Sequence, residues 1–261
     1  KTMLESDKVP TALAVTRLVQ GLAMKGDVVN IEVVEKMMAG IGKSIQLSQM
    51  LFINNKVLAQ VKNNKLDTAL EYIEPLLVPG TEAAENQATS MGYVFRKLIS
   101  EKMEPALEKF SAMAERLANQ FALYRPATDL FLQYLDAGRI EDARDLLQRC
   151  SAIAEEKKVF VAFIAQTARS SGPSWKITTI LDLIPDFAEK DIAYNYLMKS
   201  LASENDVSSA KALYEKMKAE GFHMDELFLK RFAILLKGAG EQVPFLEPPE
   251  TFKFYADKLR R

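Results

Sequence analysis

The residue types that most often carry catalysis are scarce in this chain and stand alone. It has one histidine, His223, in a polar stretch with no metal-ligand partner at the usual spacing. No phosphate-binding glycine loop, HExxH, GxSxG or paired-carboxylate motif occurs. We therefore expect no enzyme, and no catalytic residue, metal, cofactor or small-molecule substrate.

The one cysteine, Cys150, excludes an internal disulfide framework and a cysteine-cluster metal site. It lies at a position that the surrounding helix pattern reserves for apolar side chains. We interpret it as a small buried hydrophobe rather than a nucleophile.

Charge offers a second kind of chemistry, contact with phosphate. The net charge is −1 and the isoelectric point about 6.1, whereas proteins held on duplex DNA by its phosphates usually have values above about 9. The chain also has local basic residues, which either contact the phosphates of a nucleic acid or lie on ordinary solvated faces. They are Lys62, Lys65, Arg96, Lys97 and Lys102.

The elements that position these side chains are repeated. Ala69, Ala106 and Ala143 lie 37 residues apart, and Ala210 follows 67 residues later, close to two periods. Each alanine begins an apolar pattern with helical spacing. A fixed period of this size is typical of a helical solenoid, in which stacked helix pairs bury a continuous core.

The fold class predicted is all-α, an α-solenoid of helix-turn-helix repeats. Gly, Asn, Asp and Pro mark the turns, and no apolar run is long enough to span a membrane, so we expect no membrane insertion. The predicted repeats are 12–46, 50–84, 87–121, 124–158, 159–190 and 191–225, then a half repeat at 226–238, a proline-rich linker at 239–249 and a C-terminal capping helix at 250–261.

The sixth predicted repeat closely resembles the pentatricopeptide repeat. The matching residues are Tyr194, Asn195, Leu201, Ala210, Leu213, Tyr214, Met217, Gly221 and Asp225. The other repeats match in length, turn and early small residue. The ending LLKGAGEQVPFLEPPETFKFYADKLRR, with its leucine- and alanine-rich degenerate repeats, resembles leucine-rich members of this family from animal mitochondria.

This resemblance implies a fragment, the C-terminal part of a longer protein that binds single-stranded RNA. By the same resemblance it implies binding to mitochondrial mRNA together with a small RRM-type protein partner, with roles in mRNA stability, polyadenylation and translation. The location it implies is the mitochondrial matrix, with the nucleus as a second possibility.

The resemblance also implies which residues contact RNA. In this family the fifth and last residues of a repeat read one base, and Asn followed by Asp is associated with uridine. That pair is Asn195 and Asp225. The remaining candidates for RNA binding are Thr16, Gln46, Asn54, Thr128 and Lys158. The alternative is structural: Asn195 bonds the backbone of a neighbouring repeat, and Asp225 caps the next helix.

A second functional class is a protein-interaction or structural scaffold module without RNA contact in this segment. It predicts an exposed apolar patch on the concave surface, near Trp175 or near the last helix. The candidates for partner binding are Trp175, Phe252 and Tyr255; for Trp175 the alternative is ordinary packing.

Overall fold

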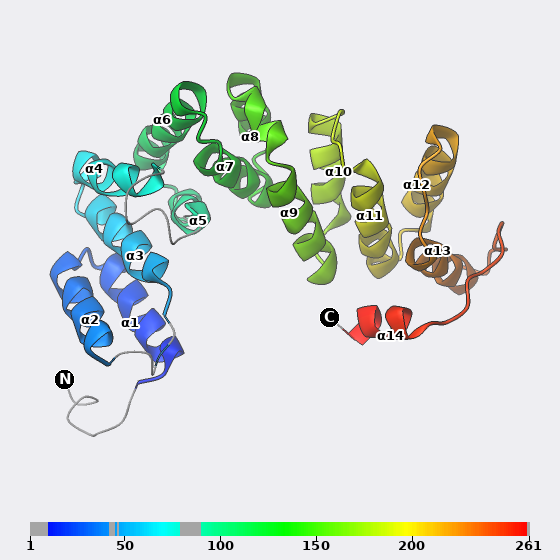
Figure 1. The fold of residues 1–261 in the computed structure, drawn as a ribbon, viewed down its shortest axis with the longest axis horizontal. Coiled ribbons are helices and arrows are strands. Elements are labelled where there is room, and N and C mark those ends of the chain that lie inside the picture. The colour runs from blue at the N-terminus through cyan, green and yellow to red at the C-terminus, as the bar shows by residue number, and fades with distance from the viewer. Residues whose placement is uncertain (1–9, 42–44, 46, 79–89, 260–261) are drawn as a thin grey trace. The chain divides into compact units, whose positions relative to one another are not determined.

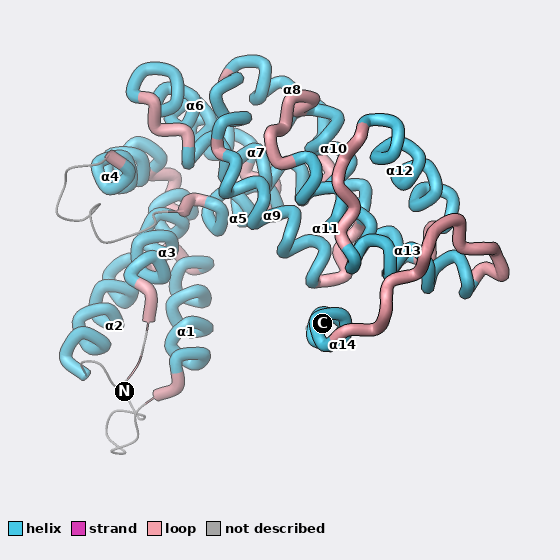
Figure 2. The backbone as a smooth tube through the Cα atoms, turned by 45° about the vertical axis from the view of Figure 1, so that its right-hand side comes forward, coloured by secondary structure: helices cyan, strands magenta, loops and turns pink. Residues whose placement is uncertain are grey.

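The computed structural model describes residues 10–41, 45, 47–78 and 90–259, with side chains through Ala256. Every regular element in these residues is helical and none is a strand (Figure 2). The predicted all-α fold of stacked helix pairs is therefore confirmed. The helices are α1 (Ala12–Met24), α2 (Val28–Ile41), α3 (Gln49–Lys62), α4 (Leu66–Leu77), α5 (Gly92–Ser100), α6 (Glu104–Phe121), α7 (Arg125–Asp136), α8 (Ile140–Arg149), α9 (Lys157–Arg169), α10 (Ser174–Leu183), α11 (Lys190–Glu204), α12 (Val207–Glu220), α13 (Glu226–Gly238) and α14 (Phe252–Leu259).

Consecutive helices form pairs joined by short turns. Each odd-numbered helix from α1 to α11 is the first of a pair, and α13 begins a half pair. The ends of the first two predicted repeats and the start of the third lie outside the described residues. The division of the chain into repeat units remains a prediction.

Local side-chain chemistry sets several helix ends. Gly26 adopts a positive φ of 70° in the first turn, where a side chain is strained, and an added Cβ would lie 2.2 Å from Asn63 Oδ1. The Asn63 amide donates to the Gly26 carbonyl at 2.8 Å, so one turn fastens to the next. Asn205 ends α11 in the left-handed conformation that Asn tolerates. The conformation of these helix ends is therefore determined mainly by the types of residue at the turn itself.

The chain forms two compact units, residues 1–153 and 154–261. In the first unit, α1, α3, α5 and α7 pack in succession, and each also packs against its own second helix (Figure 1). Phe95, Phe110 and Phe131 are fully buried in this core. Ion pairs join second helices of successive pairs, such as Lys109 with Asp67 at 2.7 Å. That pair is exposed, so the core rather than the ion pair supplies most of the stability.

In the second unit, α9, α11 and α13 pack in succession, with α10 and α12 against α11 (Figure 1). Phe160 and Phe187 meet edge to face with ring centroids 6.2 Å apart. The first helices therefore share one row in this unit as well, and they bring corresponding side chains to a common face.

The predicted terminal helix is present, but the segment before it covers the last helices. Phe245 in the proline-rich linker packs against Tyr214 and Phe232, with centroids 5.6 and 5.9 Å away. Glu247 accepts hydrogen bonds from Lys230, at 2.8 Å, and from Lys237. The linker therefore covers α12 and α13. An amphipathic pattern identifies a helix but not the surface on which it rests.

Within the described residues, no helix combines the length and the apolar character that crossing a bilayer requires.

Candidate RNA interface

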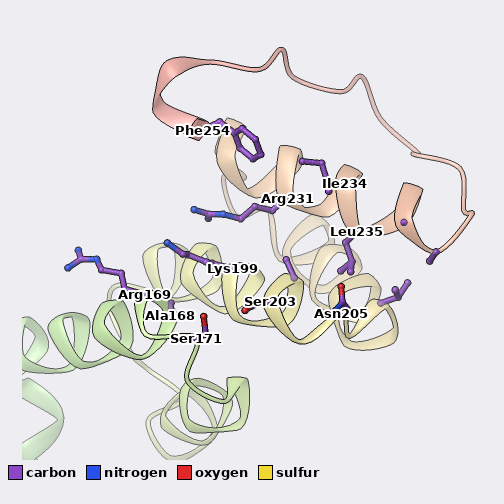
Figure 3. A pocket seen from close by; sticks show the side chains of 14 residues that line it. Ala168, Arg169, Ser171, Lys199, Ser203, Asn205, Arg231, Ile234, Leu235 and Phe254 are labelled. Atoms are coloured by element: carbon purple, nitrogen blue, oxygen red, sulfur yellow. The ribbon is translucent and has the colours of Figure 1, made fainter. Parts of the chain in front are cut away.

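A hollow of about 570 Å³ opens on the first-helix face of the second unit (Figure 3). It is bordered by α9, α11 and α13, and by Phe254 of α14. Apolar side chains such as Leu235 line it together with Ser171, Ser203 and Asn205. The size lies in the range of small-molecule and nucleotide sites, about 300–1,000 Å³.

Three cationic side chains border this hollow, one from each first helix. They are Arg169 of α9, Lys199 of α11 and Arg231 of α13. Figure 3 shows all three extending toward the same side of the hollow. None of the described residues that line it is acidic, although the chain as a whole carries one more acidic than basic residue. Lys199 and Arg231 also interact with other groups of the protein, so the row is a set of basic side chains that an anion would have to share with these groups.

Asn195 lies one helical turn before Lys199, on the same side of α11. Its Nδ2 donates to the carbonyl of Asp191 in its own helix at 2.8 Å, not to a neighbouring repeat. Its Oδ1 is buried and has no hydrogen-bond partner among the described atoms. A buried acceptor without a partner costs free energy, and because this oxygen is buried, a ligand reaches it only if the side chains around it move.

Asp225 has a structural role. Its carboxylate accepts a hydrogen bond from the backbone N–H of Phe228 at 2.7 Å and so caps α13. The described hydrogen bonds of Asp225 and Asn195 go to other residues and not to each other. The capping alternative from the sequence thus describes Asp225 in this structure, and its second carboxylate oxygen is not needed for the cap.

The other predicted RNA-binding residues lie in different environments. Thr16 and Thr128 each donate to the carbonyl four residues earlier, at 2.8 and 2.9 Å, and Thr128 is fully buried. Asn54 is 7% exposed and its Oδ1 has no described partner. Gln46 lies outside the described residues. The side chains of Thr128 and Asn54 are thus inaccessible to a base in this structure.

Lys158 occupies a different element from the one expected. The sequence places it at the end of the fourth repeat, whereas it is the second residue of α9 and is exposed. A short 3₁₀ helix at Ser151–Glu155 ends the preceding segment. Helix α9 then begins at Lys157, before residue 159, where the fifth repeat was predicted to start. Thr128 and Lys158 therefore belong to different compact units.

Asn55, rather than its neighbour Asn54, is the residue that resembles Asn195. Its Nδ2 donates to the Leu51 carbonyl at 2.7 Å, four residues earlier, and its Oδ1 lacks a described partner. It borders a smaller hollow of about 80 Å³ together with Tyr93 and Lys97. Sequence reasoning missed Asn55 by one position, because a repeat aligned by length alone does not fix the helix register.

The basic residues of the first unit are partly neutralised. Lys62 pairs with Glu101, and both border the smaller hollow. Arg96 lies over the ring of Tyr93, 5.4 Å from its centroid. Burial raises the pKa of the Tyr93 phenol, which keeps it protonated as a hydrogen-bond donor. This hollow is smaller and less positive than the one in the second unit.

The three candidate partner-binding residues are exposed. Trp175 is 41% exposed at the start of α10, and Phe252 and Tyr255 are 88% and 46% exposed on α14. The Tyr255 phenol donates to the Glu250 carboxylate, and this bond raises its pKa. Phe254, between them in sequence, is the α14 residue that borders the large hollow.

Cys150 lies in the core, as the sequence predicts. It is 1% exposed, and burial raises the pKa of its thiol. Both features disfavour the thiolate that a nucleophile requires.

Stacked helix pairs with one face of first-helix side chains define an α-solenoid of the helical-repeat class. The PPR repeat family matches residues 192–222, which cover most of α11 and α12. The resemblance to the pentatricopeptide repeat is thereby confirmed for this helix pair.

Along its whole length the chain is similar to proteins called "Leucine-rich PPR motif-containing protein, mitochondrial". It is 62% identical to the one from Xenopus tropicalis over 261 residues, and 51% and 52% identical to those from Rattus norvegicus and Mus musculus over 260 residues. The chain spans 18–19% of the length of these relatives.

Proposed function

We propose that this chain is a segment of a mitochondrial RNA-binding repeat protein, and that the first-helix face of its second unit contacts single-stranded RNA. The observation that carries the proposal is the row of cations formed by Arg169, Lys199 and Arg231 on three successive first helices. Basic side chains along one groove follow the phosphates of a single strand in other proteins that bind single-stranded nucleic acid.

Asn195 supports the same interface. Its buried Oδ1 has no described partner, lies on the residue one turn before Lys199, and would accept a hydrogen bond from the N–H of a base once neighbouring side chains move aside. Uracil presents such a donor at N3. A phosphate held by Lys199 with a base edge at Asn195 would combine positioning and recognition within one helix pair.

The names of the relatives support the wider proposal. They are called mitochondrial and PPR motif-containing, and helical repeats of this kind bind single-stranded RNA. We extend the proposal to mitochondrial mRNA as the ligand, a small RRM-type protein as partner, and roles in mRNA stability, polyadenylation and translation.

Fluorescence anisotropy with labelled U-rich and A-rich 20-mers tests the interface. The variant Arg169→Gln/Lys199→Gln/Arg231→Gln should bind about tenfold more weakly or worse, if each contact is worth about 0.5–1 kcal/mol. The matched control changes three lysines of the second helices, Lys176→Gln/Lys211→Gln/Lys218→Gln, and should retain affinity. Helical circular dichroism establishes that each variant is folded.

A protein-interaction scaffold is the second candidate function. The exposed side chains that favour it are Leu246 at 94% and Phe252 at 88%, both near the end of the second unit. Absence of RNA binding at micromolar concentrations of folded protein would overturn the RNA proposal for this segment and favour the scaffold.

A further inference from the structure

The turn between α9 and α10 brings a serine to the edge of the large hollow. Ser171 is exposed, lines the hollow and adopts a positive φ of 51° (Figure 3). The Gly172 N–H donates to the Thr167 carbonyl at 2.8 Å and closes the turn directly after it. The backbone therefore holds Ser171 in a defined position beside the hollow.

The hydroxyl of Ser171 makes no hydrogen bond within the described residues, in contrast to two neighbouring serines. The Ser170 hydroxyl donates to the Gln166 carbonyl at 2.9 Å, and the Ser174 hydroxyl donates to the Glu204 carboxylate at 2.6 Å. Those two oxygens help to fix the helix ends. The Ser171 oxygen has no such role, and it lies on an exposed turn, where chemistry on a protein surface is concentrated.

The other described serines of the second unit are less suited to modification. Ser200 is fully buried, and the Ser209 hydroxyl donates to the Asp206 carboxylate at 2.6 Å. Ser203 and Ser208 are exposed, but they lie inside the last turn of α11 and the first turn of α12. A helical turn would have to open before either could enter the active site of another enzyme.

Arg169 lies two residues before Ser171 and borders the same hollow. It is exposed, and its guanidinium makes no hydrogen bond or ion pair within the described part of the chain. Charge near the acceptor is a feature by which kinases select substrates. The same guanidinium is suited to a phosphate, because its planar fork matches phosphate oxygens. Lys199 and Arg231 have interactions of their own, and this pairing does not require them.

We propose that Ser171 is a phosphorylation site, and that its phosphate weakens RNA binding at the first-helix face of the second unit. The Ser171 Oγ attacks the γ-phosphorus of ATP, its proton passes to the base of a serine kinase, and ADP leaves with the electrons of the broken P–O bond. The inference rests on the proposed RNA-binding function, because it describes how that same face is regulated.

The effect on RNA follows from charge. A phosphoserine adds about −1.5 to −2 at neutral pH. Its pairing with Arg169 removes one basic side chain from those that border the hollow, and the remaining negative charge repels the phosphates of an RNA strand.

Phosphoserine introduced at position 171 by an expanded genetic code tests this effect directly. In the anisotropy assay it should weaken binding of the U-rich 20-mer by about fivefold or more, the worth of one lost contact. Thr178→phosphoserine adds the same charge to an exposed position of α10 that does not line the hollow, and should leave affinity unchanged. Equal affinity of the chain with and without phosphate at position 171 would overturn the proposal.

A matched pair of variants separates charge from shape. Asp and Asn both tolerate a positive φ and differ in charge. Ser171→Asp should therefore bind RNA more weakly than Ser171→Asn, while helical circular dichroism shows both variants to be folded. Indistinguishable affinities of these two variants would count against regulation by charge.

Pairing with Arg169 is measured without RNA. In phosphorus NMR titrations, the pKa of phosphoserine at position 171 should lie below that of phosphoserine in a short peptide, because the arginine favours the dianion. Arg169→Gln should return this pKa to the peptide value. A pKa that does not respond to Arg169→Gln would exclude the pairing.

Incubation of the chain with mitochondrial extract and ATP labelled at its γ-phosphate tests whether a kinase uses Ser171. Mass spectrometry should locate the label on Ser171, and Arg169→Gln should reduce it. A chain labelled only at other residues would overturn the assignment.

The outcomes separate this inference from the proposed function. If the unmodified chain binds RNA and phosphate at position 171 has no effect, only the inference fails. If the unmodified chain binds no RNA, the proposed function fails and the regulation fails with it, whatever the label and the NMR titrations show.

Discussion

At the scale of residues, one hydrogen-bond pattern recurs on the first helices and separates structural from available side chains. Thr16, Asn55, Thr128 and Asn195 all donate to the carbonyl four residues earlier. This bond uses a donor and leaves the other polar atom of an amide unengaged. The Thr128 hydroxyl is fully buried, so its remaining lone pairs are closed to a ligand, and the Oδ1 atoms of the two asparagines are buried without a described partner.

Asp225 gives a prediction at this scale, because capping and base contact require different chemistry. Asp225→Ala should lower the free energy of unfolding by about 1 kcal/mol without RNA, since the N–H of Phe228 loses its acceptor. Urea denaturation followed by circular dichroism measures the change. Asp225→Asn is the control and should retain most of the stability, because Asn caps helices about as well as Asp. Unchanged stability in the alanine variant, with lost RNA affinity, would assign Asp225 to the base instead.

At the scale of elements, the sequence predicts what local chemistry determines. Gly26, Asn64 and Asn205 adopt positive φ in the turns between helices, in keeping with the expectation that Gly and Asn mark the turns, because both tolerate this conformation. Helix pairing follows from short turns and periodic apolar residues.

Contacts between distant residues were not predictable in this way. Phe245 meets Tyr214 across 31 residues of sequence, and only the folded chain shows that an extended, proline-rich segment reaches α12. The same holds for the candidate site. Asn195 was found through its repeat, but Arg169, Lys199, Arg231 and Phe254 come together only when three helices and the chain end are placed.

The linker provides the prediction for this scale. Glu247→Gln removes the charge that pairs with the buried Lys230 and with Lys237, so amide hydrogen exchange over 241–249 should rise while α9 and α11 remain protected. Glu241→Gln is the control on the same linker, because its pair with Lys211 is exposed and contributes little. Equal exchange in the two variants would show that Phe245 alone holds the linker.

The same carboxylate fixes the direction of the pH response. Hydrogen bonds from Lys230 and Lys237 lower the pKa of Glu247 below its usual value. The stabilising contribution is therefore complete above the ordinary pKa of an unfolded Glu and is lost as pH falls through the lowered, folded value. Release of the linker at acidic pH should accordingly be absent in Glu247→Gln, which is already uncharged.

At the scale of the whole molecule, the balance of charge determines how RNA binding must depend on salt. With a net charge of −1, the chain as a whole does not attract an RNA strand. Attraction has to come from local groups, and three basic side chains border the hollow of the second unit. This differs from a protein with a broadly basic surface, where many contacts add to the salt dependence.

The slope of this salt dependence therefore reports how many phosphates the protein neutralises. Three phosphates neutralised on a single strand give a slope of log K against log salt of about −2, at roughly −0.7 per contact. Anisotropy titrations of the wild-type chain between low and near-physiological salt should give this value, and the triple cation variant should approach zero. A slope much steeper than this, retained in the triple variant, would place the RNA on other basic residues, such as Lys97 beside the smaller hollow of the first unit.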